Sequence, residues 1–239
     1  MIDQEIDIQT KNGVMNTFVT HPEEDGPHPI ILFLMDAPGK REELHDMARR
    51  LGSSGYYVML PNLYYRRVRE FEIQNASREE MRGHMDSLSN AMVNEDVNEL
   101  LGTANNDGAA RNGKVGCVGY CMSGPFAFAA AAAYPNRIAA AASFHGVRLY
   151  SDAAASPHLD ADKIKGEMYF GFAETDEYAP QEMVAALEKH LAKTKVNSRV
   201  EWYPGTEHGF VFPLRAGKYH KASAERHWER LIGIFRRCL

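Results

Sequence analysis

Residues 119–124 (Gly-Tyr-Cys-Met-Ser-Gly) place a thiol between small residues, directly after an apolar run and before an alanine-rich stretch. A strand that turns tightly into a helix is the context of a nucleophile elbow, whose apex side chain projects from the end of a sheet. Small flanking residues are needed there because a Cβ at either site would crowd the turn. The apex residue is Cys121, so the pattern predicts chemistry through a thiolate.

A thiol nucleophile needs a general base, and the base needs an acid that orients it. In hydrolases of this architecture the chain order is nucleophile, acid, histidine, each at the carboxyl end of a strand. Asp176 follows an apolar run that ends at Phe172, and His208 follows a run that ends at Tyr203. The order and the context together predict a catalytic triad of Cys121, Asp176 and His208.

An acyl-transfer site also needs backbone N–H donors for the oxyanion that forms during the reaction. Met122 directly follows the thiol, and Ala37 lies just after the apolar run that ends at Met35. We expect their two N–H groups to form the oxyanion hole. Cys117 lies within the strand before the elbow and is expected to be an inert, buried thiol.

Strand and helix patterns alternate along the chain. Strands are predicted at residues 5–10, 14–20, 29–35, 56–60, 114–119, 139–144, 167–172 and 198–203. Helices are predicted at residues 42–51, 77–103, 181–193 and 222–237. No break in composition divides the chain. The pattern therefore predicts one α/β domain over residues 1–239, with a doubly wound, mostly parallel sheet, helices on both faces and no large lid.

Composition excludes several classes of function. The net charge of −5 and the pI near 6.1 argue against a nucleic-acid-binding surface. No apolar stretch approaches the length of a membrane span, and the acidic first residues do not resemble a secretory signal. Three cysteines without paired spacing do not form a disulfide framework, so we expect a reducing, cytoplasmic location.

Cofactor and metal motifs are weak. Gly113, Gly116 and Gly119 recur on a strand rather than at a strand–helix turn, which does not support a dinucleotide site. His220 and His227 lack the spacing of a zinc motif. We therefore expect neither a cofactor nor a metal.

The chain resembles the dienelactone hydrolase (carboxymethylenebutenolidase) family of α/β-hydrolases over nearly its whole length. The resemblance is carried by residues 61–66, 113–121, 176–180 and 208–210. It implies a lidless, single-domain α/β-hydrolase fold. It also implies a triad of cysteine, aspartate and histidine, which falls on Cys121, Asp176 and His208.

The resemblance further implies a carboxylate that contacts the resting thiol, here Asp36, where the family type has glutamate. It implies an arginine that holds a substrate carboxylate, which aligns to Arg78, with Arg82 one helical turn on as the alternative. A second arginine of the family is replaced by Phe212. Either Arg215 takes its place or the substrate carries less negative charge. His145 falls where a family member would line the pocket.

These patterns predict a hydrolase that cleaves a small ester or lactone through an acyl-thioenzyme, acting as a monomer or homodimer. A broad carboxylesterase or thioesterase and a thiol-based acyl transferase are alternatives within enzymes. A relative that binds small molecules without turnover is the alternative outside them.

Overall fold

The computed structural model describes residues 1–239 and contains one eight-stranded sheet. Its spatial order is β1-β2-β4-β3-β5-β6-β7-β8. The strands are β1 (Ile2–Thr10), β2 (Gly13–His21), β3 (His28–Leu34), β4 (Tyr57–Pro61), β5 (Ala110–Tyr120), β6 (Ile138–Phe144), β7 (Glu167–Thr175) and β8 (Asn197–Glu207). The β1–β2 hairpin and β2–β4 are antiparallel, and every other pairing is parallel. The predicted doubly wound, mostly parallel sheet is confirmed.

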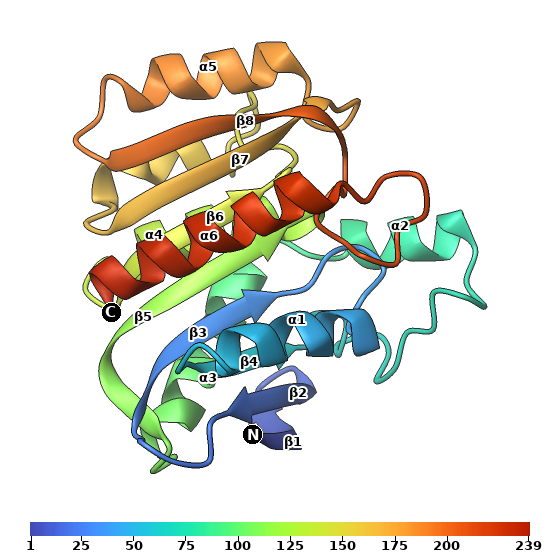
Figure 1. Ribbon diagram of the computed structural model, residues 1–239. Helices are drawn as coiled ribbons and strands as arrows, with labels where there is room; N and C mark the ends of the chain where they lie inside the picture. The colour runs from blue at the N-terminus through green and yellow to red at the C-terminus, as the bar shows by residue number, and fades with distance from the viewer.

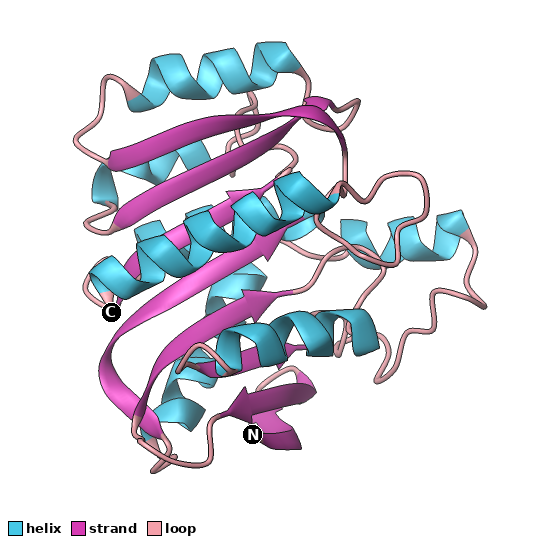
Figure 2. Ribbon diagram, viewed as in Figure 1, coloured by secondary structure: helices cyan, strands magenta, loops and turns pink.

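Helices cover both faces of the sheet (Figures 1 and 2). They are α1 (Glu42–Gly52), α2 (Arg78–Asp86), α3 (Asn90–Asn105), α4 (Gly124–Ala133), α5 (Gln181–Leu191) and α6 (Lys221–Cys238). In Figure 1, α1 and α6 lie in front of the sheet, whereas α3 and α4 lie behind it. None of the helices combines the length and apolar composition needed to cross a bilayer.

The single helical segment predicted at 77–103 is wrong, because the structure divides it into α2 and α3. A serine begins each of the two helices, and Ser89 marks the break between them. The Ser77 side chain accepts a hydrogen bond from the Glu80 N–H, and the Ser89 side chain accepts one from the Met92 N–H. Each serine satisfies a free donor at a helix N-terminus, so the sequence favours two helix starts rather than one continuous helix.

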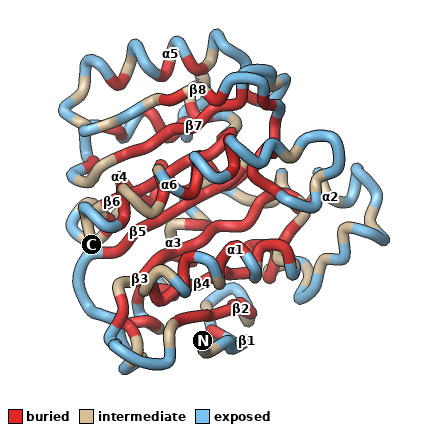
Figure 3. Tube along the Cα trace, in the orientation of Figure 1, coloured by how far each residue is buried: buried red, intermediate tan, exposed pale blue.

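The central strands form the core, as the buried trace in Figure 3 shows. The apolar run of β3 is buried on both faces because helices cover each side of the sheet. Cys117 on β5 is also fully buried, and desolvation raises the pKa of its thiol to about 12. The prediction that this cysteine is an inert packing residue agrees with its burial.

The turn after β5 holds Cys121 in the left-handed region of backbone conformation, with φ of 53°. This conformation is uncommon for a residue with a Cβ and persists only when its surroundings enforce it. The Ser123 hydroxyl is one such constraint. It accepts a hydrogen bond from the Tyr120 N–H and lies 3.0 Å from the Leu34 carbonyl oxygen, which ties the turn to β3.

Glycine is required on both sides of the turn. A Cβ at Gly119 would lie 2.1 Å from the Ser123 carbonyl oxygen, and a Cβ at Gly124 would lie 2.4 Å from the Ser143 hydroxyl oxygen. Real Cβ atoms do not approach other atoms so closely. The small residues that flank the thiol therefore let the chain fold back on itself within a few residues.

This close approach predicts that Gly119→Ala destabilises the protein. We expect the free energy of unfolding to fall by about 2 kcal/mol or more, since the backbone of the turn must move to make room. Gly102→Ala is the matched control because it adds the same methyl group in α3, with nothing within 4 Å. Chemical denaturation measures both variants, and equal midpoints for the two would contradict the explanation.

Candidate active site

The candidate residues follow four different strands of the sheet. Ala37 follows β3, Cys121 follows β5, Asp176 follows β7 and His208 follows β8. Because β3 and β5 to β8 run parallel, their carboxyl ends meet at one edge of the sheet. Figure 1 shows α2 and the red loop between β8 and α6 beyond this edge.

His208 and Asp176 are in direct contact. Nδ1 of His208 lies 2.7 Å from Oδ2 of Asp176, and both side chains are almost completely buried. The other carboxylate oxygen accepts hydrogen bonds from the N–H groups of Tyr178 and Ala179. With both oxygens engaged, Asp176 fixes the orientation of the imidazole and leaves its Nε2 for the thiol.

The environment of His208 favours its protonated form. Burial by itself lowers the pKa of the imidazole, but the hydrogen bond to Asp176 and the interaction with the Cys121 thiolate outweigh it and raise the pKa to about 9. A raised pKa stabilises the fold fully below the ordinary value near 6.5, and this contribution is lost as pH rises through 9. At neutral pH the raised pKa therefore favours an imidazolium at His208.

Tyr64 links the two residues expected to form the oxyanion hole. Its hydroxyl donates a hydrogen bond to the Ala37 carbonyl at 2.9 Å and lies 3.2 Å from the Met122 sulfur. Burial strongly raises the pKa of Tyr64, so the phenol remains a neutral donor. No hydrogen bond takes up the Ala37 N–H, which leaves it available for a ligand. Sequence reasoning did not assign Tyr64 a role, although it lies in the 61–66 motif.

Asp36 is fully buried between two arginines. Arg41 approaches its Oδ1 at 2.5 Å, and Arg215 approaches its Oδ2 at 3.0 Å. No hydrogen bond joins Asp36 to Cys121. The carboxylate that was expected to contact the resting thiol is instead held by guanidinium groups, and sequence reasoning missed Arg41 as its first partner.

Arg78 and Arg82 are both exposed on α2. Hydrogen bonding to Glu177 raises the pKa of Tyr178, and the charge of Arg78 partly opposes that rise. The Tyr178 ring packs edge-on against His208, with ring centroids 5.0 Å apart. The charge of Arg78 therefore reaches Tyr178, although no direct contact joins Arg78 or Arg82 to the candidate residues.

His145 and Phe212 were expected to contact substrate, and in the structure both have no exposed surface. The backbone at His145 has φ of 40°, and its ring lies inside the protein, 4.8 Å from the His208 ring. Burial, with the charges of His208 and Arg215, holds the pKa of His145 well below its ordinary value. Neutral His145 therefore packs behind His208. Phe212 packs beneath the guanidinium groups of Arg41 and Arg215.

Comparison with known proteins identifies the family. Residues 15–239 match the sequence model of the dienelactone hydrolase family. The chain belongs to this family. A Synechocystis protein that carries a provisional carboxymethylenebutenolidase name is 26% identical over 235 residues, covering 96% of this chain and 94% of the relative. The carboxymethylenebutenolidase of Rhodococcus opacus is 26% identical over 220 residues, covering 90% of this chain and 84% of the relative.

Solved structures share the fold. The crystal structure of a Klebsiella pneumoniae protein, provisionally named a dienelactone hydrolase, aligns with a TM-score of 0.89 at 24% identity and covers 98% of both chains. The dienelactone hydrolase of Anabaena variabilis aligns with a TM-score of 0.71 at 16% identity, covering 100% of this chain and 98% of that one. Similarity over the full length agrees with a single α/β-hydrolase fold without a lid.

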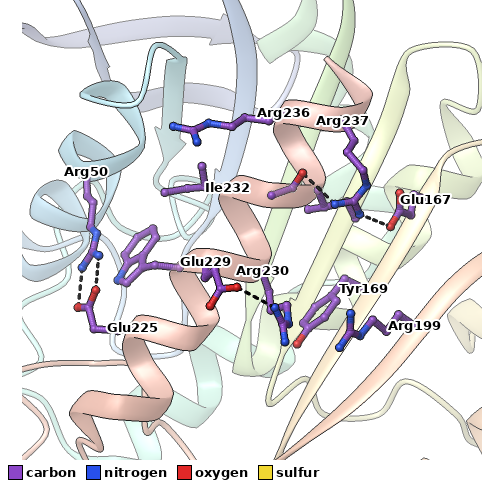
Figure 4. A pocket seen from close by; sticks show the side chains of 13 residues that line it. Arg50, Glu167, Tyr169, Arg199, Glu225, Glu229, Arg230, Ile232, Arg236 and Arg237 are labelled. Carbon is purple, nitrogen blue, oxygen red and sulfur yellow. Dashed lines mark hydrogen bonds and ion pairs between the residues drawn. The ribbon is translucent and has the colours of Figure 1, made fainter.

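The surface groove in Figure 4 is separate from the candidate active site. It has a volume of about 620 Å³ and runs along α6. Its charged side chains largely pair with one another, as in Arg50–Glu225 and Arg237–Glu167. None of the candidate residues that follow the carboxyl ends of the strands lines it. The chain also contains no group of three or more His, Cys, Asp or Glu side chains that could hold a metal ion.

The contribution of the thiolate to the pKa of His208 is directly testable. We expect Cys121→Ala to lower the His208 pKa clearly below about 9, because the negative charge beside the imidazole is removed. Titration of the His208 ring protons by NMR measures the shift. Cys238→Ala is the control, since that thiol lies at the end of α6 beside Glu167. An unchanged His208 pKa in Cys121→Ala would refute a contribution of Cys121 to this pKa.

Proposed function

We propose that this protein hydrolyses a small ester or lactone through an acyl-thioenzyme intermediate on Cys121. One observation carries the proposal. An imidazole held by Asp176 at 2.7 Å lies beside a partly exposed thiol on a strained turn, and the thiolate contributes to the raised pKa of that imidazole. Membership of the dienelactone hydrolase family supports esters and lactones as the substrate class.

In the first half of the reaction, the Cys121 thiolate attacks the carbonyl carbon of the substrate. The negative charge moves to the carbonyl oxygen, where the N–H groups of Ala37 and Met122 stabilise it. The tetrahedral intermediate then collapses, the ester C–O bond breaks, and imidazolium His208 gives its proton to the leaving alkoxide. In a lactone the alkoxide remains part of the acyl group.

In the second half, neutral His208 accepts a proton from water while the water oxygen attacks the thioester carbon. The same N–H groups stabilise the second oxyanion. Collapse of this intermediate releases the carboxylic acid product and returns the thiolate beside imidazolium His208. Asp176 holds the imidazole in one orientation through both halves.

The alternative functions differ in the fate of the acyl group on the thiol. A broad carboxylesterase or thioesterase would transfer many kinds of acyl group to water, and an acyl transferase would need an acceptor other than water. A non-catalytic relative would bind ligand without releasing product. We also propose that the enzyme works in the reducing cytoplasm on a small-molecule substrate, since reducing conditions keep a catalytic thiol free.

Turnover of a panel of small esters and lactones tests the proposed function. We expect Cys121→Ala to lower kcat/KM by about 10³-fold or more, because the nucleophile is lost. An iodoacetamide probe should label Cys121 in the native protein. Cys238→Ala is the matched thiol control and should retain activity. Full activity in Cys121→Ala, together with labelling of the native protein only at another cysteine, would refute the proposal.

We further propose that Arg78 anchors a carboxylate on the distal part of the substrate, since a guanidinium binds a planar carboxylate with two hydrogen bonds. Arg78→Ala should raise KM about tenfold for carboxylate-bearing esters, equivalent to the loss of ~1.4 kcal/mol of binding. KM for neutral esters of the same size should not change. Arg82→Ala on the same helix is the control. Equal effects of Arg78→Ala on both classes of ester would reject this assignment.

A further inference from the structure

Two loops at the carboxyl edge of the sheet carry groups that must act together in the proposed reaction. The loop after β3, residues 35–41, contains Ala37, and the loop after β8, residues 208–220, begins with His208. Figure 1 shows the second loop in red as it passes beyond the strand ends. Neither loop is a helix or a strand, so side-chain contacts must fix the distance between the oxyanion donor and the general base.

Four side chains supply these contacts. Nη1 of Arg41 lies 2.5 Å from Asp36, and its Nη2 lies 2.6 Å from Glu43. Nη2 of Arg215 lies 3.0 Å from the other oxygen of Asp36. The second oxygen of Glu43 accepts a hydrogen bond from the Leu214 N–H at 2.7 Å. We call this group the ion brace; it consists of Asp36, Arg41, Glu43 and Arg215. Both of its carboxylates are buried.

The packing around the ion brace is equally close. The Phe212 ring lies under both guanidinium groups, at 5.4 Å from Arg41 and 4.8 Å from Arg215. Arg41 also donates to the Gly39 carbonyl in its own loop. Gly209, next to His208, has φ of +86°, and a Cβ there would lie 2.4 Å from Arg215. The chain beside the catalytic histidine therefore packs directly on the brace.

We infer that the ion brace positions the His208 loop against the oxyanion loop, and that Arg41 is a positioning residue for the reaction. This inference rests on the proposed function. Asp36 then acts through the two arginines rather than by taking the proton of Cys121. Two guanidinium groups face two carboxylates, so the charges of the brace compensate one another and the buried carboxylates remain stable.

The ion brace also decides between the two alternatives left open by Phe212. Arg215 is committed to Asp36, so it does not serve as a second arginine for a substrate carboxylate. Arg78 and Arg82 on α2 are then the arginines left for that role. We therefore expect the part of the substrate next to the scissile carbonyl to be uncharged, with any carboxylate at its far end.

The test compares Asp36→Asn, Arg41→Met and their double variant. If the four residues act as an ion brace, each single change should lower kcat for a neutral ester about 10- to 100-fold, since small displacements of catalytic groups have effects of this size. KM should stay within about threefold. The double variant should be no slower than the worse single variant, because both changes break one unit. Arg41→Lys, which keeps the charge, should recover part of the activity.

Two further readouts separate the ion brace from direct action of Asp36 on the thiol. Amide hydrogen exchange should quicken in residues 209–220 in both single variants, with the sheet unchanged. The pH profile of Cys121 alkylation by iodoacetamide should be the same in both. Arg50→Met is the control, because it breaks a two-bond arginine–carboxylate pair in the groove of Figure 4 and should leave kcat and loop exchange unchanged.

The inference is overturned if Asp36→Asn slows alkylation about tenfold while Arg41→Met leaves kcat, alkylation and loop exchange at their wild-type values. That result would make Asp36 a direct partner of the thiol. Additive effects in the double variant would overturn it too. If the wild-type protein shows no turnover, only the proposed function is refuted. Amide hydrogen exchange in residues 209–220 would still test the ion brace. A variant that loses protection in the sheet has unfolded, and Arg41→Lys then takes its place.

Discussion

The left-handed backbone of Cys121 is the constraint on which the rest of the site depends. Cys121 adopts this conformation in a tight turn after β5. Neighbouring atoms leave no room for a Cβ at Gly119 or Gly124, and a hydrogen bond from Ser123 ties the turn to β3. The strain is offset by the surrounding sheet, which is buried on both faces. The thiol of Cys121 stays partly exposed at the carboxyl edge of the sheet, whereas Cys117, four residues earlier, is fully buried.

The candidate residues include two separate sets of buried charges. In one set, Asp176 orients His208 and, with the thiolate, raises its pKa. In the other, Asp36 is held by Arg41 and Arg215. Burying any of these charges alone would cost several kcal/mol, so each carboxylate is matched by a cation or by several N–H donors. The first set includes the proposed general base, and the second connects the loop after β8 with Asp36 and Glu43.

The parts of the site that follow local rules are predictable from the sequence. Residues 119–124 specify the turn after β5 through short-range sterics, and the apolar runs place Asp176 and His208 after their strands. The ion brace is not predictable in this way. Its contacts join residues 171 and 179 positions apart, Glu43 to Leu214 and Arg215 to Asp36, and no local pattern encodes such pairings.

His145 and Phe212 also show that local sequence patterns do not encode contacts between distant segments. His145 follows β6 and Phe212 lies four residues after His208, but whether a loop side chain faces solvent or the interior depends on packing between distant segments. The boundary between α2 and α3 was missed for a different reason. The helical spacing of polar residues continues across it, and only the capping role of Ser89 marks the break.

The proposed reaction requires a covalent bond between the acyl group and the sulfur of Cys121. Rapid mixing with an activated ester, acid quenching and intact-mass analysis measure that bond directly. We predict a transient mass increase equal to the acyl group, located on Cys121 by peptide mapping and decaying at the rate of product release. Product formation without any adduct on that sulfur, or an adduct that forms and decays equally in Cys121→Ala, would contradict the account.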